Sequence, residues 1–292
     1  MQSNNPVFRR SDAFNGQVSS QGTNAYGNQT YPGNGATHQG YGQAPGYDQP
    51  QYGATTTTGE RMTIDSVVQK TGISLAIVMV FATLTWWFIG DIRPQDNPDF
   101  EQNMGTLYLA LMVGSFGAFG LSLVNSFKRV VSPALVIAFC ALEGVAMGAL
   151  SKFFDVQFGD GIVTQAVIGT FAAFAGTLAA YKFFNIQVGS KFRTFVIAAM
   201  FGMVGLGLLE MVLGAFGNQI GLFGFGGIGL LFAIAGLVLG VFMLILDFDF
   251  VEQGVAAGIE ERESWRAAFA LTVSLVWIYT NLLRILAIFS QE

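Results

Sequence analysis

The sequence is poor in the residues that build most catalytic and metal sites. It has one cysteine, Cys140, and one histidine, His38, in 292 residues. A single cysteine excludes a disulfide framework or a thiolate metal site. A single histidine leaves no Ser/His pairing and no His-Glu-x-x-His zinc motif to support an intramembrane enzyme. We therefore expect no enzymatic activity, no cofactor and no resident metal.

Charge is also scarce. Only 11% of the residues are charged, against about 25% in an ordinary soluble domain. The formal net charge of −5 leaves no basic face that could bind nucleic acid. In contrast, 52% of the residues are hydrophobic and the mean hydropathy is +0.51. This composition is typical of a membrane protein, with the lipid bilayer as its first partner.

The apolar residues fall into long runs. A membrane-spanning helix needs about 20 mostly apolar residues. Seven segments qualify, at residues 73–89, 104–124, 131–150, 162–181, 195–216, 227–246 and 267–289. The sequence thus predicts an all-α, polytopic membrane domain of seven helices over residues 61–292.

Residues 1–60 have a different composition. They contain ten Gly, four Pro and five of the eight Tyr. Such a segment cannot bury enough apolar surface to offset the entropy of ordering, so we expect a disordered Gly/Tyr/Gln-rich tail. The following residues, 62–72, predict a short interfacial helix capped by Thr63 that leads into the bilayer.

The distribution of Lys and Arg predicts the orientation. With the N-terminus in the cytoplasm, only Arg93 and Lys152 fall outside the cell, and Arg284 lies within the last segment. The other basic residues are then cytoplasmic: Arg9, Arg10, Arg61, Lys70, Lys128, Arg129, Lys182, Lys191, Arg193, Arg262 and Arg266. This bias predicts a plasma-membrane protein with a cytoplasmic N-terminus and an external C-terminus.

Two aspartates follow the sixth apolar segment. If that helix ends near Leu246, Asp247 and Asp249 lie at its C-terminal end, where the helix dipole disfavours further negative charge. They should therefore bind a proton or a cation. Since residues two apart on a helix point to different faces, only one of them can face inward, and Asp247 is the better candidate. The alternative is that both are solvated acids at the membrane edge.

Three more charged residues lie inside apolar segments. Glu143 is near the middle of the third segment, where a carboxylate costs several kcal/mol unless it is protonated, paired, hydrogen-bonded or hydrated. It either joins two helices as a protonated side chain or lies on a proton or cation path. Glu210 and Arg284 fall at similar depth in the outer half, which predicts an ion pair with a structural or a gating role.

Several of these features together resemble the Bax inhibitor family of membrane proteins, in particular a bacterial branch with a disordered N-terminal extension. They are the seven segments, ALEG around Glu143, LDFDFVEQG after the sixth segment, and LVWIYTNLLRIL in the last. The resemblance runs from about Met62 to Phe289, so the first sixty residues lie outside it. It implies six helices packed around a central seventh.

The resemblance also implies a pH-sensitive calcium leak. In the family, two aspartates share a proton near the cytoplasmic mouth and latch to an arginine on the second helix. Asp247 matches the first aspartate, and the second position falls on either Asn281 or Ser274. The second segment has no arginine before Lys128 and Arg129. Asp249, Glu143 and Glu210 are candidate substitutes, and calcium would pass through a weak site.

Two functions from different classes follow. The first is cation permeation gated by protonation of intramembrane carboxylates. The second is a non-transporting membrane partner that modulates other membrane proteins, as a regulator of membrane proteases or of stress responses, with the tyrosine-rich tail as its binding arm.

Overall fold

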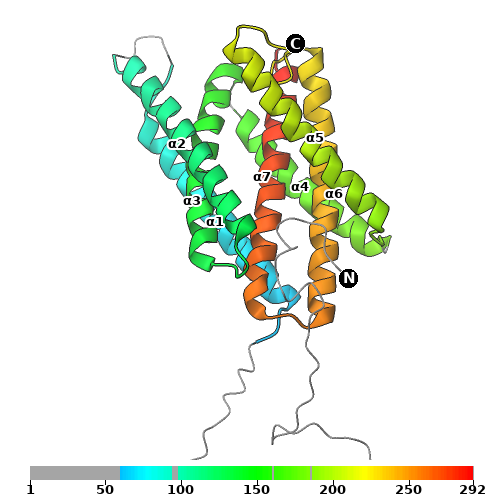
Figure 1. Ribbon diagram of the computed structural model, residues 1–292. Coiled ribbons are helices and arrows are strands. Elements are labelled where there is room, and N and C mark those ends of the chain that lie inside the picture. Colours follow the sequence, from blue (N-terminus) through cyan, green and yellow to red (C-terminus); the bar gives the residue numbers. More distant parts are fainter. Residues whose placement is uncertain (1–59, 94–97, 160, 185, 292) are drawn as a thin grey trace, which may run out of the picture.

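The structure is a computed structural model that describes residues 60–93, 98–159, 161–184 and 186–291. This part of the chain forms seven long helices, and each is long and apolar enough to cross a membrane. They are α1 Ile64–Ile89, α2 Phe100–Phe127, α3 Pro133–Phe158, α4 Ile162–Phe183, α5 Ser190–Ala215, α6 Gly227–Ala257 and α7 Ser264–Phe289, with a short 3₁₀ helix at Glu261–Glu263 before α7 (Figure 1). The predicted all-α, seven-helix membrane fold is confirmed.

Local sequence explains where α1 begins. Thr63 caps the helix, because its hydroxyl accepts a hydrogen bond from the Ser66 amide at 3.0 Å and the Ser66 hydroxyl accepts one from the Thr63 amide at 3.1 Å. The predicted cap is confirmed. The predicted separate interfacial helix is wrong, since residues 64–89 form one continuous helix. Nothing between Lys70 and Ile73 breaks it, as Gly72 is tolerated inside a helix.

The sixth helix is longer than its apolar segment. We expected it to end near Leu246, but α6 continues to Ala257 and ends at Gly258, whose left-handed backbone (φ 63°) suits a helix terminus. Asp247 and Asp249 therefore lie within a helix rather than at its end. The extension is held by packing, because Phe248, Val251 and Gly254 are buried.

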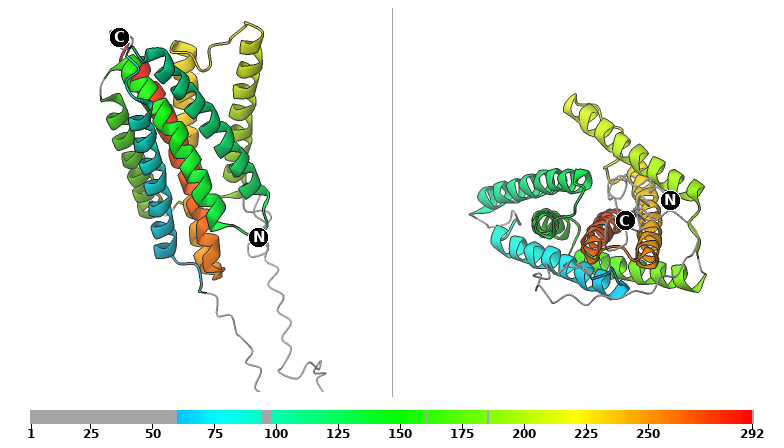
Figure 2. Two further views of the ribbon diagram at one scale, coloured as in Figure 1. Left: turned by 90° about the vertical axis from the view of Figure 1, so that its left-hand side faces the viewer. Right: turned by 60° about the horizontal axis from the view of Figure 1, so that its bottom comes forward.

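Helix α7 lies inside the bundle and packs against α1, α3, α4 and α6. The two remaining helices are peripheral: α2 packs on α3 and α1, and α5 packs on α6 (Figure 2). Of the six helices expected around the seventh, four make substantial contact with it. The apolar surface of α5 explains its position, since only Val196 and Glu210 of its residues are buried and the rest of the helix suits contact with lipid.

Glycines spaced four apart bring helix backbones together. A Cβ on Gly148 would lie 2.4 Å from the Ala82 carbonyl oxygen, and one on Gly144 would lie 2.6 Å from that of Val78. These two glycines therefore set the close contact between α3 and α1. Gly236 and Gly240 do the same between α6 and α7, where a Cβ would meet Asn281 and Ile278.

The lower end of the bundle in Figure 1, where α1 begins, is joined by polar contacts. The Met62 amide donates to the Ile259 carbonyl at 2.8 Å, and the Glu261 amide donates to Glu60 at 2.7 Å. Lys70 pairs with Glu261, and the hydroxyls of Ser66 and Ser264 are 2.7 Å apart. The start of α1 is thereby fixed to the α6–α7 connection. The predicted tail, apart from Glu60, lies outside the described residues.

Candidate functional site

Asp247 is a buried carboxylate at the α6–α7 interface. It is 6% exposed, and its Oδ2 accepts a hydrogen bond of 2.5 Å from the Ser274 hydroxyl of α7. Within the described part of the chain, no Lys or Arg forms an ion pair with it. The interpretation of Asp247 as a solvated acid at the membrane edge is therefore wrong, because the extension of α6 carries it into the bundle.

The structure distinguishes the two positions proposed for the second family aspartate. Ser274 is 2% exposed and contacts Asp247 directly. Asn281 lies two turns further along α7, donates to the Trp277 carbonyl at 2.8 Å, and packs against Gly236. Asp247 therefore faces a hydroxyl where a second carboxyl was expected, and Asn281 is not part of the same cluster.

Asp249 points to a different face of α6, as the two-residue spacing predicts. It is nevertheless buried, at 8% exposed, so the expectation that only one of the two aspartates faces inward is wrong. Its Oδ2 accepts hydrogen bonds from Arg193 of α5 at 2.9 Å and from Gln253 at 2.7 Å. The Arg193–Asp249 ion pair is partly buried, with the Asp249 side chain 11% exposed. Asp249 thus connects α5 to α6. The nearby carboxylate of Glu252 accepts a 2.6 Å hydrogen bond from the Tyr181 hydroxyl of α4.

Glu143 lines a cavity of about 290 Å³ between α2, α3 and α7. Its carboxylate makes no hydrogen bond or ion pair within the described residues, so the structure does not show it joining two helices. The other residues that line this cavity are Ser115, Phe119, Ser122, Phe139, Met147, Val273, Val276, Trp277 and Thr280. The structure does not bring Glu143 and Asp247 together, since Asp247 is not among these residues.

The predicted ion pair between Glu210 and Arg284 is not formed. The Glu210 carboxylate accepts backbone hydrogen bonds from Ile220, Gly221 and Leu222 at 2.8–3.1 Å. Arg284 donates to the Leu222 carbonyl at 2.6 Å, and its guanidinium lies 5.3 Å from the centre of the Phe223 ring. The turn between α5 and α6 lies between the two charges, and its residue Leu222 binds both of them.

Lys152 is also inside the fold. It was expected outside the third apolar segment, but α3 continues to Phe158 and Lys152 is buried. Its ammonium donates to the Trp86 carbonyl of α1 at 2.8 Å and lies 5.8 Å from the centre of the Trp86 ring. Lys152 therefore stabilises the α1–α3 contact near the upper end of the bundle.

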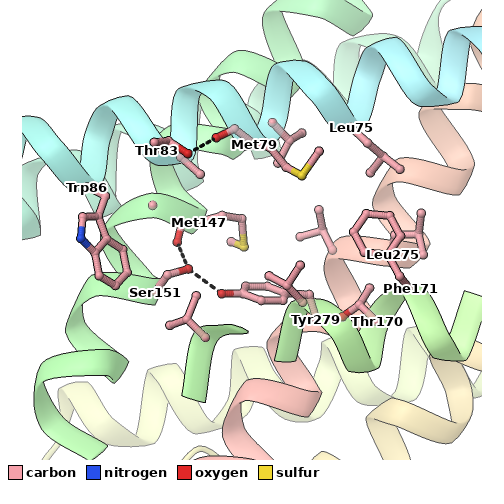
Figure 3. Close-up of a pocket in the computed structure, with 16 residues that line it drawn as sticks. Leu75, Met79, Thr83, Trp86, Met147, Ser151, Thr170, Phe171, Leu275 and Tyr279 are labelled. Atoms are coloured by element: carbon pink, nitrogen blue, oxygen red, sulfur yellow. Dashed lines mark hydrogen bonds between the residues drawn. The ribbon is translucent and has the colours of Figure 1, made fainter. Parts of the chain in front are cut away.

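A larger cavity of about 470 Å³ lies between α1, α3, α4 and α7 (Figure 3). Its lining is mostly apolar, and it contains no charged residue. The hydroxyls of Ser151 and Tyr279 are 2.6 Å apart, and the Ser151 hydroxyl also donates to the Met147 carbonyl at 2.5 Å. These hydroxyls were missed because a lone Ser or Tyr in an apolar segment does not reveal its neighbour.

The two cavities are adjacent. Met147 of α3 and Val276 of α7 line both of them. Counted along α3, Phe139 and Glu143 of the smaller cavity lie nearer the lower end, while Ser151 of the larger cavity lies nearer the upper end. Two apolar side chains therefore stand between a cavity with a carboxylate and a cavity without charge.

No described group of three or more His, Cys, Asp or Glu side chains has the arrangement of a metal site. Any cation in this part of the molecule would need hydroxyls, carbonyls or water as ligands beside one carboxylate.

The comparison with known families agrees with this architecture. The sequence model of the family described as Bax inhibitor 1 like matches residues 5–291. The match begins well before Met62, so the expectation that the first sixty residues lie outside the similarity was wrong. No curated protein matches the chain.

Proposed function

Because the chain belongs to the Bax inhibitor 1 like family of membrane proteins, we propose that it is a pH-responsive cation leak, with calcium as the permeating ion. In this proposal the protein lies in the plasma membrane, and the lower end of the bundle faces the cytoplasm. Lys128 and Arg129, which directly follow α2, and Arg193 in the first turn of α5 are then cytoplasmic, in line with the positive-inside rule. The protein needs no catalytic residue or cofactor for this role.

One observation carries the proposal: Asp247 is a buried carboxylate whose only described hydrogen-bond partner is the neutral hydroxyl of Ser274. A carboxylate without a cationic partner in a low-dielectric site is costly in its charged form. Gain or loss of one proton therefore changes the energy of the α6–α7 contact directly. A packed interface that is biased by one proton is a suitable element for a gate.

The contact with Ser274 defines how this chain would differ from the family pattern. Two aspartates at this contact would share a proton, whereas here Asp247 alone would carry it and Ser274 would donate to it. The second helix has no arginine before Lys128 that could form the latch that the resemblance implies. The arginine nearest to this part of α6 in the described contacts is Arg193 of α5, which binds Asp249 at 2.9 Å and not Asp247.

The test is calcium efflux from liposomes that contain the purified full-length protein. We expect a leak that depends on pH, and we expect Asp247→Asn to abolish the pH dependence while the protein still inserts and folds. Asp65→Asn is the matched control, because Asp65 is an exposed aspartate in the first turn of α1. It should leave the pH response unchanged.

Vesicles that stay tight at every pH would contradict the leak and favour the second function, a non-transporting partner of other membrane proteins. Deletion of residues 1–59 adds a second arm to the same experiment. The leak should survive the deletion, because Asp247 and its neighbours lie in the helical domain. Loss of the leak in the truncated but folded protein would count against the proposal.

A further inference from the structure

The larger cavity, of about 470 Å³, opens toward the bilayer (Figure 3). Met79 of α1 and Phe171 of α4 line it, and they are 48% and 44% exposed. Both residues fall near the middle of a membrane-spanning helix, so the surface around them contacts the hydrocarbon core of the bilayer. Helices α1 and α4 each pack on α7 but pack little on one another. The cavity can therefore be entered sideways, between α1 and α4, by a molecule in the bilayer.

The size and the apolar lining of this cavity decide what fills it. Its volume lies within the range of about 300–1,000 Å³ that is usual for ligand pockets. Apolar cavities stay dry, because water finds too few hydrogen-bond partners in them. If the cavity were empty, its lining would also lose the dispersion contacts that a packed neighbour supplies. Hydrocarbon is the material that surrounds the opening, and it suits the lining.

The hydroxyl groups in the cavity do not require a polar ligand. The Ser151 hydroxyl donates to the Met147 carbonyl, so the Tyr279 hydroxyl, 2.6 Å away, donates to Ser151. The hydroxyls of Thr83 and Thr170 each donate to a carbonyl of their own helix at 2.8 Å. None of the described residues that line the cavity is charged. A ligand without polar groups therefore leaves none of these donors unsatisfied.

The lining also adapts to a flexible ligand. Met79 and Met147 are unbranched side chains with several rotatable bonds, and such side chains fill irregular space around chains of different shape. We propose that the cavity binds one acyl chain of a bilayer phospholipid, which enters between α1 and α4 and reaches the Ser151–Tyr279 hydroxyl pair. This site is independent of the proposed leak.

The test is photolabelling of the full-length protein in vesicles. The vesicles contain a phospholipid with a photoreactive diazirine near the end of one acyl chain, and the labelled residues are identified by mass spectrometry. We expect label on Leu275, which lines the cavity and is only 3% exposed. Lipid that merely surrounds the protein reaches exposed residues such as Ile168, but it does not reach Leu275.

Two neighbouring residues of α4 give a matched pair of variants. Val167 lines the cavity, whereas Ile168 is 64% exposed and does not line it. Val167→Trp fills part of the cavity and should remove most of the label on Leu275, because a filled site does not admit a chain without strain. Ile168→Trp adds the same side chain to the lipid-facing surface and should leave that label unchanged.

A second pair on α1 keeps the proposal testable if Val167→Trp fails to fold. Met79→Trp narrows the opening at an exposed position, where a larger side chain is tolerated, and should also reduce the label on Leu275. Val80→Trp is its control, because Val80 is exposed and does not line the cavity. Tyr279→Phe should keep the label, because a hydrocarbon chain needs no hydrogen bond from the cavity.

Three results would overturn the proposal. The first is label confined to exposed residues, or label on Leu275 that persists in every folded Val167→Trp and Met79→Trp variant. The second is loss of the label in folded Tyr279→Phe, which would indicate a polar ligand. The third is stronger labelling of Leu275 by a free fatty acid with the same diazirine than by the phospholipid. Vesicles that are tight to calcium but show the expected labelling would refute the leak and support the acyl-chain site.

Discussion

Glu210 and Arg284 bind the same residue, Leu222, through its two backbone groups. The Leu222 amide donates to Glu210 at 3.1 Å, and the Leu222 carbonyl accepts from Arg284 at 2.6 Å. The acid and the base therefore hold the turn between α5 and α6 against α7. Their role is to satisfy backbone groups of this turn that the helices leave unpaired.

This geometry predicts that exchanging the two charges does not restore stability. In the double variant Glu210→Arg/Arg284→Glu, a cation would face three backbone amides and an anion would face a carbonyl. We expect each single variant to lower the free energy of unfolding by about 1–3 kcal/mol, and the double variant to be at least as unstable as either. Thermal unfolding in detergent measures this. Recovery of stability in the double variant would instead indicate a direct ion pair.

The close approach of α3 and α1 gives a second prediction. Gly148→Ala places a methyl group 2.4 Å from the Ala82 carbonyl, which the two backbones can accommodate only by moving apart. We expect a loss of about 1–3 kcal/mol in stability. Gly176→Ala in α4 is the matched control, because a Cβ there meets no atom within 4 Å. Equal thermal stability of the two variants would show that the contact is looser than the structure indicates.

The Arg193–Asp249 pair gives a third prediction. Arg193→Met leaves the Asp249 carboxylate, 11% exposed, with Gln253 as its remaining described partner. We expect a destabilisation of about 1–3 kcal/mol, because the pair is only partly buried. Lys191→Met removes a neighbouring exposed cation and should be nearly neutral. Thermal unfolding of both variants at low and high salt measures the difference in stability. An Arg193→Met variant as stable as the wild type would show that the ion pair does not hold α5 against α6.

Met147 gives a fourth prediction, which rests on the proposed leak. This side chain and Val276 lie between the two cavities, so Met147→Ala should join them and increase calcium efflux from liposomes. Replacing Met79, which lines only the larger cavity, by Ala should have a smaller effect. Efflux that is equal in the wild type and in Met147→Ala would place the path elsewhere.

The sequence by itself determined the membrane class and the seven helices, because runs of about 20 apolar residues have no other stable place than a bilayer. It also identified four charged side chains for which the structure was expected to supply partners: Glu143, Glu210 and Arg284 within those runs, and Asp247 directly after one. It placed the end of α6 wrongly at Leu246, whereas the helix continues to Ala257. Hydropathy marks where charged residues begin, but it does not mark where the backbone hydrogen bonds of the helix stop.

Tertiary structure decided the partners of those charges. Asp247 faces Ser274, and Asp249 faces Arg193. Glu210 and Arg284 share the backbone of Leu222. The partners in these contacts are far apart in the sequence. The register between α6 and α7 follows from Gly236 and Gly240, whose missing side chains admit Asn281 and Ile278. Such contacts depend on how each helix is rotated about its axis and how far it is shifted along its neighbour. Only the packed structure sets these two quantities.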